Sequence, residues 1–251
     1  MDIIQTFYDT LADQYDKLFA DWQATAREQA ALLDGLFRSG GFDRGARVLD
    51  CACGIGTQTI GLAALGYCVT GSDISEAELA QARQRAAQNG ADIRWERVDF
   101  RHLEETFAET FDIVLAMDNA LPHMLSRDDL KCAVESMVSR LASGGLFVAS
   151  LRDYDALLES KPPYSPPYIH KTDKGQRISF QTWDWEGDQY RLVQYIIDDE
   201  DAPQVSKFSC VYRATRREEL TELLLAAGCR EVVWKFPEET AFYQPIVMAK
   251  K

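Results

Sequence analysis

The feature that most constrains this chain is a short apolar strand that runs into a glycine-bearing turn and then into a helix. The strand, residues 47–51, carries Asp50 near its end, and Gly54 and Gly56 follow in the turn. Glycine lets a ligand approach the backbone closely, and the amides at a helix start suit an anionic group. The next strand ends at Asp73, 23 residues after Asp50, where a carboxylate can accept both hydroxyls of a ribose. This arrangement predicts a ribose-containing ligand at one edge of a sheet.

Strands and helices continue to alternate beyond this turn. Apolar strands are expected at 67–72, 93–98, 111–116 and 146–151, with helices at 57–65, 76–89 and 127–141 between them. Apolar strands separated by helices of this length indicate a parallel sheet that is covered on both faces.

The pattern changes after Leu151. Four prolines within 161–167 predict a loop, because proline fits neither a helix interior nor a central strand. Alternating apolar and polar residues then predict an antiparallel meander at 178–185, 190–197 and 204–212, followed by a helix at 216–227 and strands at 231–236 and 242–249.

We therefore predict an α/β fold in a single domain, with a Rossmann-like, seven-stranded, mostly parallel sheet. Helical periodicity over 5–38 predicts two further helices before the first strand. The expected parts are a helical lid at 1–40, a cofactor-binding core at 41–152, an antiparallel insertion over an acceptor pocket at 160–214, and a final helix and strands at 215–251.

Charge and composition limit the partners. The net charge is −13 among 251 residues, which argues against nucleic acid, because phosphate backbones are bound by clustered Lys and Arg. The chain has neither the start of a signal peptide nor an apolar run of the roughly 18 residues that a membrane span needs. We expect a cytoplasmic protein with reduced cysteines, no membrane contact and no metal site; its state as a monomer or homo-oligomer is left open.

Two cofactor classes compete for the glycine turn. A nicotinamide dinucleotide site has a third glycine, and Thr59 stands at that position. Asp50 would also repel a pyrophosphate, whereas it suits the α-ammonium of a methionine group. These residues favour S-adenosylmethionine, with S-adenosylhomocysteine as its product, over a dinucleotide or a purely structural turn.

The chain resembles the class I S-adenosylmethionine-dependent methyltransferases at five separate motifs. They are VLDCACGIGTQT, GSDIS with Asp73, ERVDF with Asp99, FDIVLAMDNALPH and LASGGLFV. The resemblance implies that Asp99 caps the adenine amino group and that Phe100 lies against the ring.

Within that superfamily the chain resembles the glycine N-methyltransferase group. Residues 117–123 stand where that group has a G-N-S-x-x-H-like segment, and 152–155 where it has an R-N-Y-D-like segment. By this resemblance Asn119 faces the acceptor amine, His123 and the backbone of Met117 touch the cofactor, and Arg152 grips a substrate carboxylate. Asp153 replaces an asparagine of the group, and His170 stands near an expected tyrosine, with Tyr168 two residues away.

Tyr8 and Tyr15 lie in the expected lid. The resemblance implies that Tyr15 packs on the cofactor and that Tyr8 donates a hydrogen bond near the sulfonium. Trp22 and Arg27 are further lid candidates, with Arg27 paired to the methionine carboxylate; the alternatives are packing for Trp22 and a solvated face for Arg27.

The expected site residues fall into three sets. The catalytic set is Asn119 and Tyr8, and the substrate-binding set is Arg152, Asn119, Tyr168 and His170. The cofactor-binding set is Tyr15, Trp22, Arg27, Asp50, Cys51, Ala52, Gly54, Asp73, Ile74, Asp99, Phe100, Met117 and His123.

Several of these residues have a structural alternative. Arg152 could form a salt bridge to Asp153, Asp155 or a lid carboxylate. His123 could be merely structural, and Asn119 could simply form a turn.

The acceptor itself has competing interpretations. The first is a small amino acid or amine, similar to glycine or sarcosine. The aromatic residues of the insertion suit a planar heterocycle or another secondary metabolite, and a non-catalytic cofactor-binding protein is the third interpretation. A neutral amine needs no strong base during methyl transfer, whereas an oxygen acceptor would need His123 or His170 as one.

Overall fold

A computed structural model describes residues 3–199 and 202–251 of the chain, and a seven-stranded sheet forms its centre. Across the sheet the order is β10 (Glu231–Lys235), β11 (Ile246–Lys250), β5 (Leu141–Ser150), β4 (Phe111–Ala116), β1 (Arg47–Asp50), β2 (Cys68–Asp73) and β3 (Arg94–Arg97). β1 to β5 pair in parallel, and β11 pairs antiparallel with both β5 and β10. The predicted Rossmann-like, mostly parallel sheet is confirmed.

The strand order reverses direction at β1. From β1 the chain first moves outward to β2 and β3, and it then crosses to β4 and β5 on the other side. Ligands of open α/β sheets bind at such a switch point, outside the carboxyl ends of the strands. The ends of β1, β2 and β4, at Asp50, Asp73 and Ala116, therefore mark where a ligand can bind.

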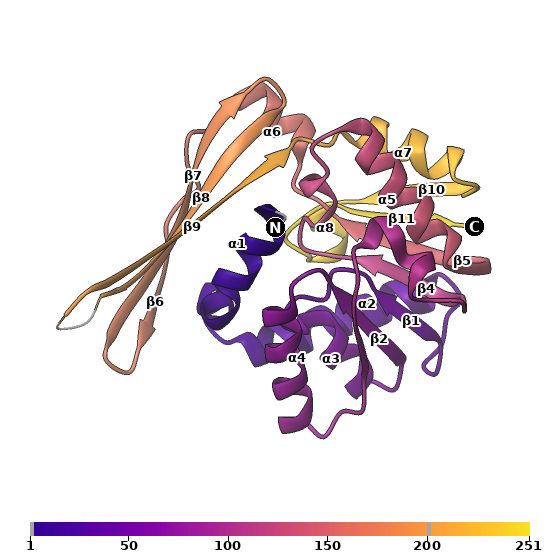
Figure 1. The fold of residues 1–251 in the computed structure, drawn as a ribbon, viewed down its shortest axis with the longest axis horizontal. Helices are drawn as coiled ribbons and strands as arrows, with labels where there is room; N and C mark the ends of the chain where they lie inside the picture. Colours follow the sequence, from indigo (N-terminus) through magenta and orange to yellow (C-terminus); the bar gives the residue numbers. More distant parts are fainter. Residues whose placement is uncertain (1–2, 200–201) are drawn as a thin grey trace.

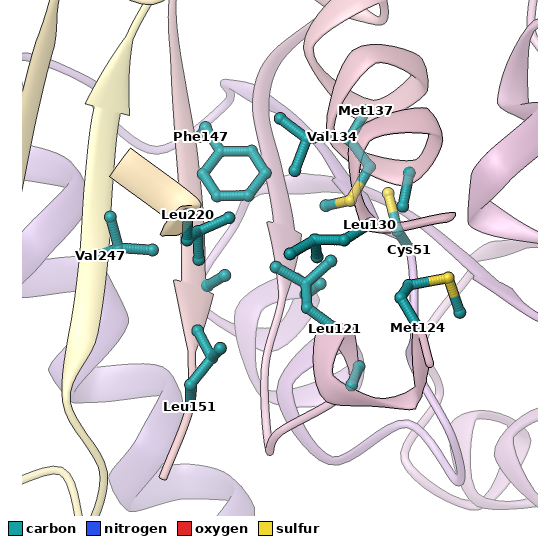
Figure 2. Close-up of a cluster of buried hydrophobic side chains, with 14 of the residues drawn as sticks. Cys51, Leu121, Met124, Leu130, Val134, Met137, Phe147, Leu151, Leu220 and Val247 are labelled. Carbon is teal, nitrogen blue, oxygen red and sulfur yellow. The ribbon is translucent and has the colours of Figure 1, made fainter. Parts of the chain in front are cut away.

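Two cores cover the faces of the sheet. On one face, Leu130, Val134 and Met137 of α5 (Arg127–Ser139) pack with Phe147 of β5 and Leu220 of α7 (Arg217–Ala226) (Figure 2). On the other face, α2 (Trp22–Ser39) and α3 (Thr57–Ala64) pack against the alternate residues of the same strands. Because both faces of these strands are buried, their sequences are continuous apolar runs rather than alternating ones.

The N-terminal helices differ from the predicted pair. Three elements are present: α1 (Ile3–Leu11), a 3₁₀ helix η1 (Ala12–Leu18) and α2. α1 and η1 line both cavities described below, and α2 adds Thr25 and Gln29 to the second of them. Further along α2, Leu33 and Phe37 are buried against the sheet. The predicted extent of the lid, 1–40, stays a prediction, and residues 1–2 of that range lie outside the described part. Below, the word lid refers to α1 and η1.

The insertion is a four-stranded antiparallel sheet in the order β6 (Tyr168–Thr172), β7 (Gly175–Glu186), β8 (Gln189–Asp199) and β9 (Gln204–Arg213). It projects from the body of the molecule, and α1 lies between the two (Figure 1). The predicted meander accounts for β7, β8 and β9. The sequence analysis missed β6, and it also missed α6 (Tyr154–Ser160) and α8 (Pro237–Thr240).

Three further helices follow strands of the central sheet, and two strands begin at other residues than predicted. α4 (Glu76–Gln88) follows β2, and the short 3₁₀ helices η2 (Phe100–Glu105) and η3 (Leu121–His123) follow β3 and β4. β11 begins at Ile246 rather than at 242, because Pro245 has no amide for the ladder. β5 begins at Leu141, since a register shift near Phe111 accommodates extra residues before Leu146. Among the described residues, no helix combines the length and apolar character needed to span a membrane.

Candidate functional site

The glycine turn after β1 has a backbone that other residues would strain. Gly54 and Gly56 have φ values of +51° and +88°, in the left-handed region that favours glycine. A Cβ on Gly54 would also lie 2.8 Å from Oε2 of Glu78. Glycine at these positions is therefore required by the turn itself, which leads directly into α3.

Two carboxylates flank this turn, and both are buried. Asp50 accepts a hydrogen bond from the Thr59 hydroxyl at 2.7 Å, and burial raises the pKa of Asp50 to about 7. The Thr59 side chain that breaks the dinucleotide pattern thus holds the acidic residue of the turn. Asp73 accepts from the amides of Gly54 and Ser75, each at 2.9 Å, and burial raises the pKa of Asp73 to about 6.

A cavity of about 740 Å³ opens at these strand ends. Most predicted cofactor residues line it: Tyr15, Cys51, Ala52, Gly54, Asp73, Ile74, Asp99, Phe100, Met117 and His123. Asp50 lies behind the wall and is fully buried. We call this the cofactor cavity. The described residues that line it carry four carboxyl groups, Asp73, Glu78, Asp99 and Asp118, and one arginine, Arg101.

Asp99 has a charged partner that the sequence analysis did not anticipate. Its carboxylate accepts from Nε and an Nη of Arg101, with a shortest distance of 2.6 Å. It also accepts from the Arg101 amide at 2.9 Å and so caps η2. Phe100 follows on the same cavity wall. The adenine role of both residues stays a prediction.

The lid brings Tyr8 onto His123. The Tyr8 hydroxyl lies 2.8 Å from Nε2 of His123, and the Tyr8 and Tyr15 ring centres are 6.5 Å apart. Burial, aided by Arg152, lowers the pKa of His123 to about 3, so the ring is neutral at ordinary pH. A neutral His123 can hold the Tyr8 hydroxyl in place without adding a positive charge to the site.

The lid is fastened to two other parts of the molecule. Asp9 of α1 accepts from the Ser75 hydroxyl at 2.6 Å, directly beside Asp73. Lys17 of η1 forms an ion pair with Asp198 of β8 at 2.7 Å. α1 and η1 therefore connect the cofactor cavity to the antiparallel sheet.

A second and larger cavity, of about 2150 Å³, lies between the lid, the sheet edge and the insertion. We call it the acceptor cavity. Arg152, Asn119 and Tyr168 of the predicted acceptor set line it, together with Trp183 and Tyr212 of the insertion. Of the other insertion aromatics, Tyr164 is exposed and Tyr195 stacks on Phe180 at 5.0 Å.

Arg152 makes no salt bridge to any residue that the structure describes. Its guanidinium donates to the Tyr190 hydroxyl at 2.6 Å and to Oε1 of Gln181 at 2.9 Å, and it lies 5.0 Å from the Trp183 ring centre. Within residues 3–199 and 202–251, no carboxylate lies within 4.0 Å of it. Asp153 and Asp155, the alternative partners, pair instead with Arg217 at 2.5 and 3.2 Å. The salt-bridge alternative for Arg152 is therefore wrong.

Asn119 both forms a turn and faces the acceptor cavity. It has a φ of +69°, and its Oδ1 accepts from the Arg152 amide at 3.1 Å. Its Nδ2 is buried with no partner in the described residues. A buried amide donor without a partner costs free energy unless a ligand satisfies it.

Asp118 is a site residue that the sequence analysis missed. It has a φ of +56°, and its carboxylate accepts from Tyr243 at 2.7 Å and from Gln58 at 2.8 Å. The only signal in the sequence was a departure, because the G-N-S-x-x-H-like pattern has glycine at this position. Glu78 is a second missed residue, a buried carboxyl group on the wall of the cofactor cavity.

Three predicted residues lie away from both cavities. The Trp22 indole N–H donates to the Thr57 hydroxyl at 2.9 Å, and the Arg85 guanidinium lies over the Trp22 ring. Arg27 is exposed. Both line a separate depression beside α3. Their placement in the cofactor site is corrected, because α2 packs on the sheet and directs them elsewhere. His170 packs against Tyr168 on β6 but does not line the acceptor cavity.

Comparison with known sequences agrees with this geometry. Residues 48–145 match the family described as "Methyltransferase domain". The chain is 30% identical over 156 residues to a glycine/sarcosine N-methyltransferase of Parasynechococcus marenigrum, covering 62% of this chain and 54% of that protein. It is 27% identical over 228 residues to the glycine N-methyltransferase of Homo sapiens, covering 82% and 76%. The chain spans 54–60% of the length of the first three such relatives.

Solved structures share the fold across nearly the whole chain. The CcbJ methyltransferase from Streptomyces caelestis superposes with a TM-score of 0.78 at 20% identity, covering 99% of this chain and 98% of that one. An S-adenosylmethionine-dependent methyltransferase from Clostridium acetobutylicum superposes with a TM-score of 0.76 at 18% identity, covering 97% and 98%. At these identities the likeness concerns the fold.

Proposed function

We propose that the chain is a class I methyltransferase, similar to the glycine N-methyltransferase group, and that it methylates the amine nitrogen of a small acceptor that bears a carboxylate. The donor in this class is S-adenosylmethionine, and the product is S-adenosylhomocysteine. The single observation that carries the acceptor assignment is the unpaired, enclosed guanidinium of Arg152.

The cofactor cavity fits this donor by its charge. Four carboxyl groups and one arginine line it, the arginine is already paired with Asp99, and His123 is neutral. Such a wall suits a ligand with a sulfonium and an ammonium, and it would repel the two phosphates of a dinucleotide. The left-handed Gly54 leaves the backbone open beside Asp73, where the hydroxyls of a ribose would donate hydrogen bonds to this carboxylate.

When bound, S-adenosylmethionine supplies an electrophilic methyl group on a sulfonium. Tyr8 and Tyr15 line both cavities and so border the place where donor and acceptor meet. Burial raises the pKa of Tyr8 well above its usual range, which keeps its hydroxyl protonated as a hydrogen-bond donor. Asn119 offers a free amide N–H to the acceptor side. Positioning of this kind supplies most of the rate in a displacement that needs no base during transfer.

Arg152 provides the anchor at the other end of the acceptor. A positive charge removed from water is costly unless a negative charge or strong hydrogen bonds compensate it. Its partners here, Tyr190 and Gln181, are neutral. A carboxylate of the acceptor would complete the pair, since guanidinium and carboxylate form two parallel hydrogen bonds.

A bulkier acceptor is the second candidate, and one observation favours it. The acceptor cavity is about 2150 Å³ and has Trp183, Tyr168 and Tyr212 in its wall. These rings suit the face of a heterocycle or an organic cation.

Transfer of labelled methyl groups tests the proposal. The protein is incubated with methyl-labelled S-adenosylmethionine and with glycine, sarcosine, other amino acids, simple amines and heterocyclic amines. We expect label on an amino-acid nitrogen. Arg152→Ala should lower kcat/KM for that acceptor about 100-fold, because removing one member of a buried charge pair costs roughly 2–5 kcal/mol.

The matched control is Arg216→Ala, which removes an arginine that pairs with Asp155 outside the acceptor cavity. It should leave kcat/KM unchanged. Label on a heterocycle alone, at the same rate in Arg152→Ala, would establish the second candidate and reject the carboxylate anchor.

A further inference from the structure

The two cavities meet at a small set of side chains. Among the described residues, only Tyr8, Tyr15 and Asp118 line both the cofactor cavity and the acceptor cavity. Methyl transfer requires donor and acceptor to be in contact, so it takes place where the cavities join. Asp118 is the one carboxylate at this junction.

The backbone holds Asp118 in place at an energetic cost. Asp118 and Asn119 are two consecutive residues other than glycine with left-handed φ values, +56° and +69°. Aspartate and asparagine adopt this conformation more readily than most residues, and it persists where the surroundings enforce it. Ser150 of β5 does so, because its hydroxyl accepts from the Asp118 amide at 2.7 Å and its carbonyl accepts from the Asn119 amide at 3.0 Å.

The Asp118 carboxylate has hydrogen bonds but no opposite charge. Its two oxygens accept from neutral groups, the Tyr243 hydroxyl and the Gln58 amide, and Gln58 is held in turn by Gln29 at 2.6 Å. No lysine or arginine of the described residues lies within 4.0 Å of it. Half-burial raises the pKa of Asp118 above its usual value, as expected for a carboxylate without a cation.

Asp118 and Arg152 therefore form a complementary pair of uncompensated charges on the wall of one cavity. Neither neutralises the other directly, since no ion pair joins them. A ligand with a cationic group at one end and an anionic group at the other would compensate both. Simple amino acids have this charge pattern.

We propose that Asp118 binds the protonated amine of a zwitterionic amino-acid acceptor at the junction of the two cavities and takes a proton from it before methyl transfer. This inference rests on the proposed function and adds to it the charge state of the acceptor. The acceptor carboxylate lies at Arg152, and the amine lies beside Tyr8 and Tyr15.

The proton balance is simple. An ammonium has no lone pair, so one N–H bond breaks and an O–H bond forms on the Asp118 carboxylate. The electron pair of the broken bond becomes the lone pair that attacks the methyl carbon. The methylated product is itself an ammonium, the sulfur becomes a neutral thioether, and the proton on Asp118 leaves to solvent through the acceptor cavity.

Binding by calorimetry tests the first half of the proposal. Wild type, Asp118→Asn and Asp118→Gly are each saturated with S-adenosylhomocysteine and titrated with glycine, β-alanine, acetate and ethylamine. Asparagine and glycine both accept the left-handed conformation, so both variants retain the turn. We expect wild type to bind the zwitterions more tightly than acetate, and both variants to lose about tenfold or more of that preference while binding acetate as before.

The pH profile tests the second half. In Asp118→Asn, kcat/KM for the zwitterion that wild type methylates should follow the fraction of free amine and fall about tenfold for each pH unit below the amine pKa. In wild type this fall should begin at a lower pH, because Asp118 removes the proton. Superimposable profiles would overturn the proton-transfer step.

Asp155→Asn is the matched control, since it removes a carboxylate that is already paired with Arg217 and that lines neither cavity. It should change neither the zwitterion preference nor the pH profile. Weaker binding of S-adenosylhomocysteine to Asp118→Asn, with unchanged zwitterion preference, would assign the carboxylate to the cofactor and overturn the inference. Failure of wild type to bind S-adenosylhomocysteine would overturn the proposed function itself and this inference with it.

Discussion

The two cavities of this molecule are built in contrasting ways. The cofactor cavity is smaller and acidic, and its wall comes from strand ends and from backbone amides of the turn after β1. The acceptor cavity is larger and aromatic, contains the unpaired Arg152, and takes much of its wall from the lid and the inserted sheet. Most of the first wall follows directly after four strands of one sheet, whereas the second wall joins the lid, the sheet edge and a separate inserted sheet.

This contrast has a physical basis. A turn between a strand and a helix has few conformations, so Gly54, Asp50 and Thr59 reach their positions through local geometry. The Arg152 site depends on Gln181 and Tyr190, which belong to two strands of a different sheet. Changes in the inserted sheet can therefore alter the acceptor while the donor site is retained.

The largest effect should come from Asp73→Ala. The variant loses two hydrogen bonds from backbone amides and the carboxylate that faces the predicted ribose. Hydrogen bonds to charged groups contribute about 1.5–3 kcal/mol each, so affinity for S-adenosylhomocysteine should fall about 100-fold or more by calorimetry. Glu76→Ala, an exposed carboxylate at the start of α4, is the control. Equal affinity in wild type and Asp73→Ala would show that the two cavities have been assigned the wrong ligands.

A pH-dependent effect of intermediate size should come from Asp50. Its pKa is about 7 in the folded chain and near 4 in an unfolded one. Between those values the folded chain keeps a proton that the unfolded chain releases, so the free energy of unfolding falls as pH rises from about 4 to about 7 and then levels off. Asp50→Asn should flatten this slope in Tm measured across the same window. Asp73, with a pKa near 6, should leave a smaller residual slope.

Parallel Tm slopes for wild type and Asp50→Asn would contradict the predicted contribution of this buried carboxyl group. An equivalent substitution at Asp112, a partly exposed carboxylate that accepts from Arg47, is the control and should leave the slope as in wild type.

A smaller and selective effect should come from Tyr190→Phe. The variant loses the 2.6 Å hydrogen bond that orients the Arg152 guanidinium. At roughly 1 kcal/mol, KM for a carboxylate-bearing acceptor should rise about fivefold. Affinity for S-adenosylhomocysteine should not change, because Tyr190 does not line the cofactor cavity. A loss of cofactor affinity instead would show that the two cavities do not bind their ligands independently.

The smallest effect should come from Lys17→Ala, which breaks the ion pair between the lid and Asp198. Partly exposed pairs contribute about 0–1 kcal/mol, and Arg177 still neutralises Asp198 at 2.5 Å. Tm should shift by no more than a few degrees, with cofactor affinity preserved. A large loss of either would mean that the inserted sheet supports the cofactor cavity as well as the acceptor cavity.

Much of the donor site was accessible from sequence. Ten of the thirteen predicted cofactor residues line the cofactor cavity, and Asp50 lies directly behind its wall. Trp22 and Arg27 were misplaced because helical periodicity does not reveal which surface a helix packs against, and α2 packs on the sheet. Asp118 was missed because its importance arises from two cavities meeting, which no local pattern records.

By itself the sequence determined the alternating strands and helices of the parallel core, the glycine turn and the acidic residues at the strand ends, since each follows from short-range backbone geometry and from two-sided burial. The tertiary structure alone decided that Asp153 and Asp155 pair with Arg217, that Arg152 has no carboxylate partner among the described residues, and that Asp118 lies at the junction of the cavities. Charge compensation depends on which groups come within a few ångströms of one another. That distance is set by packing between elements far apart in the chain.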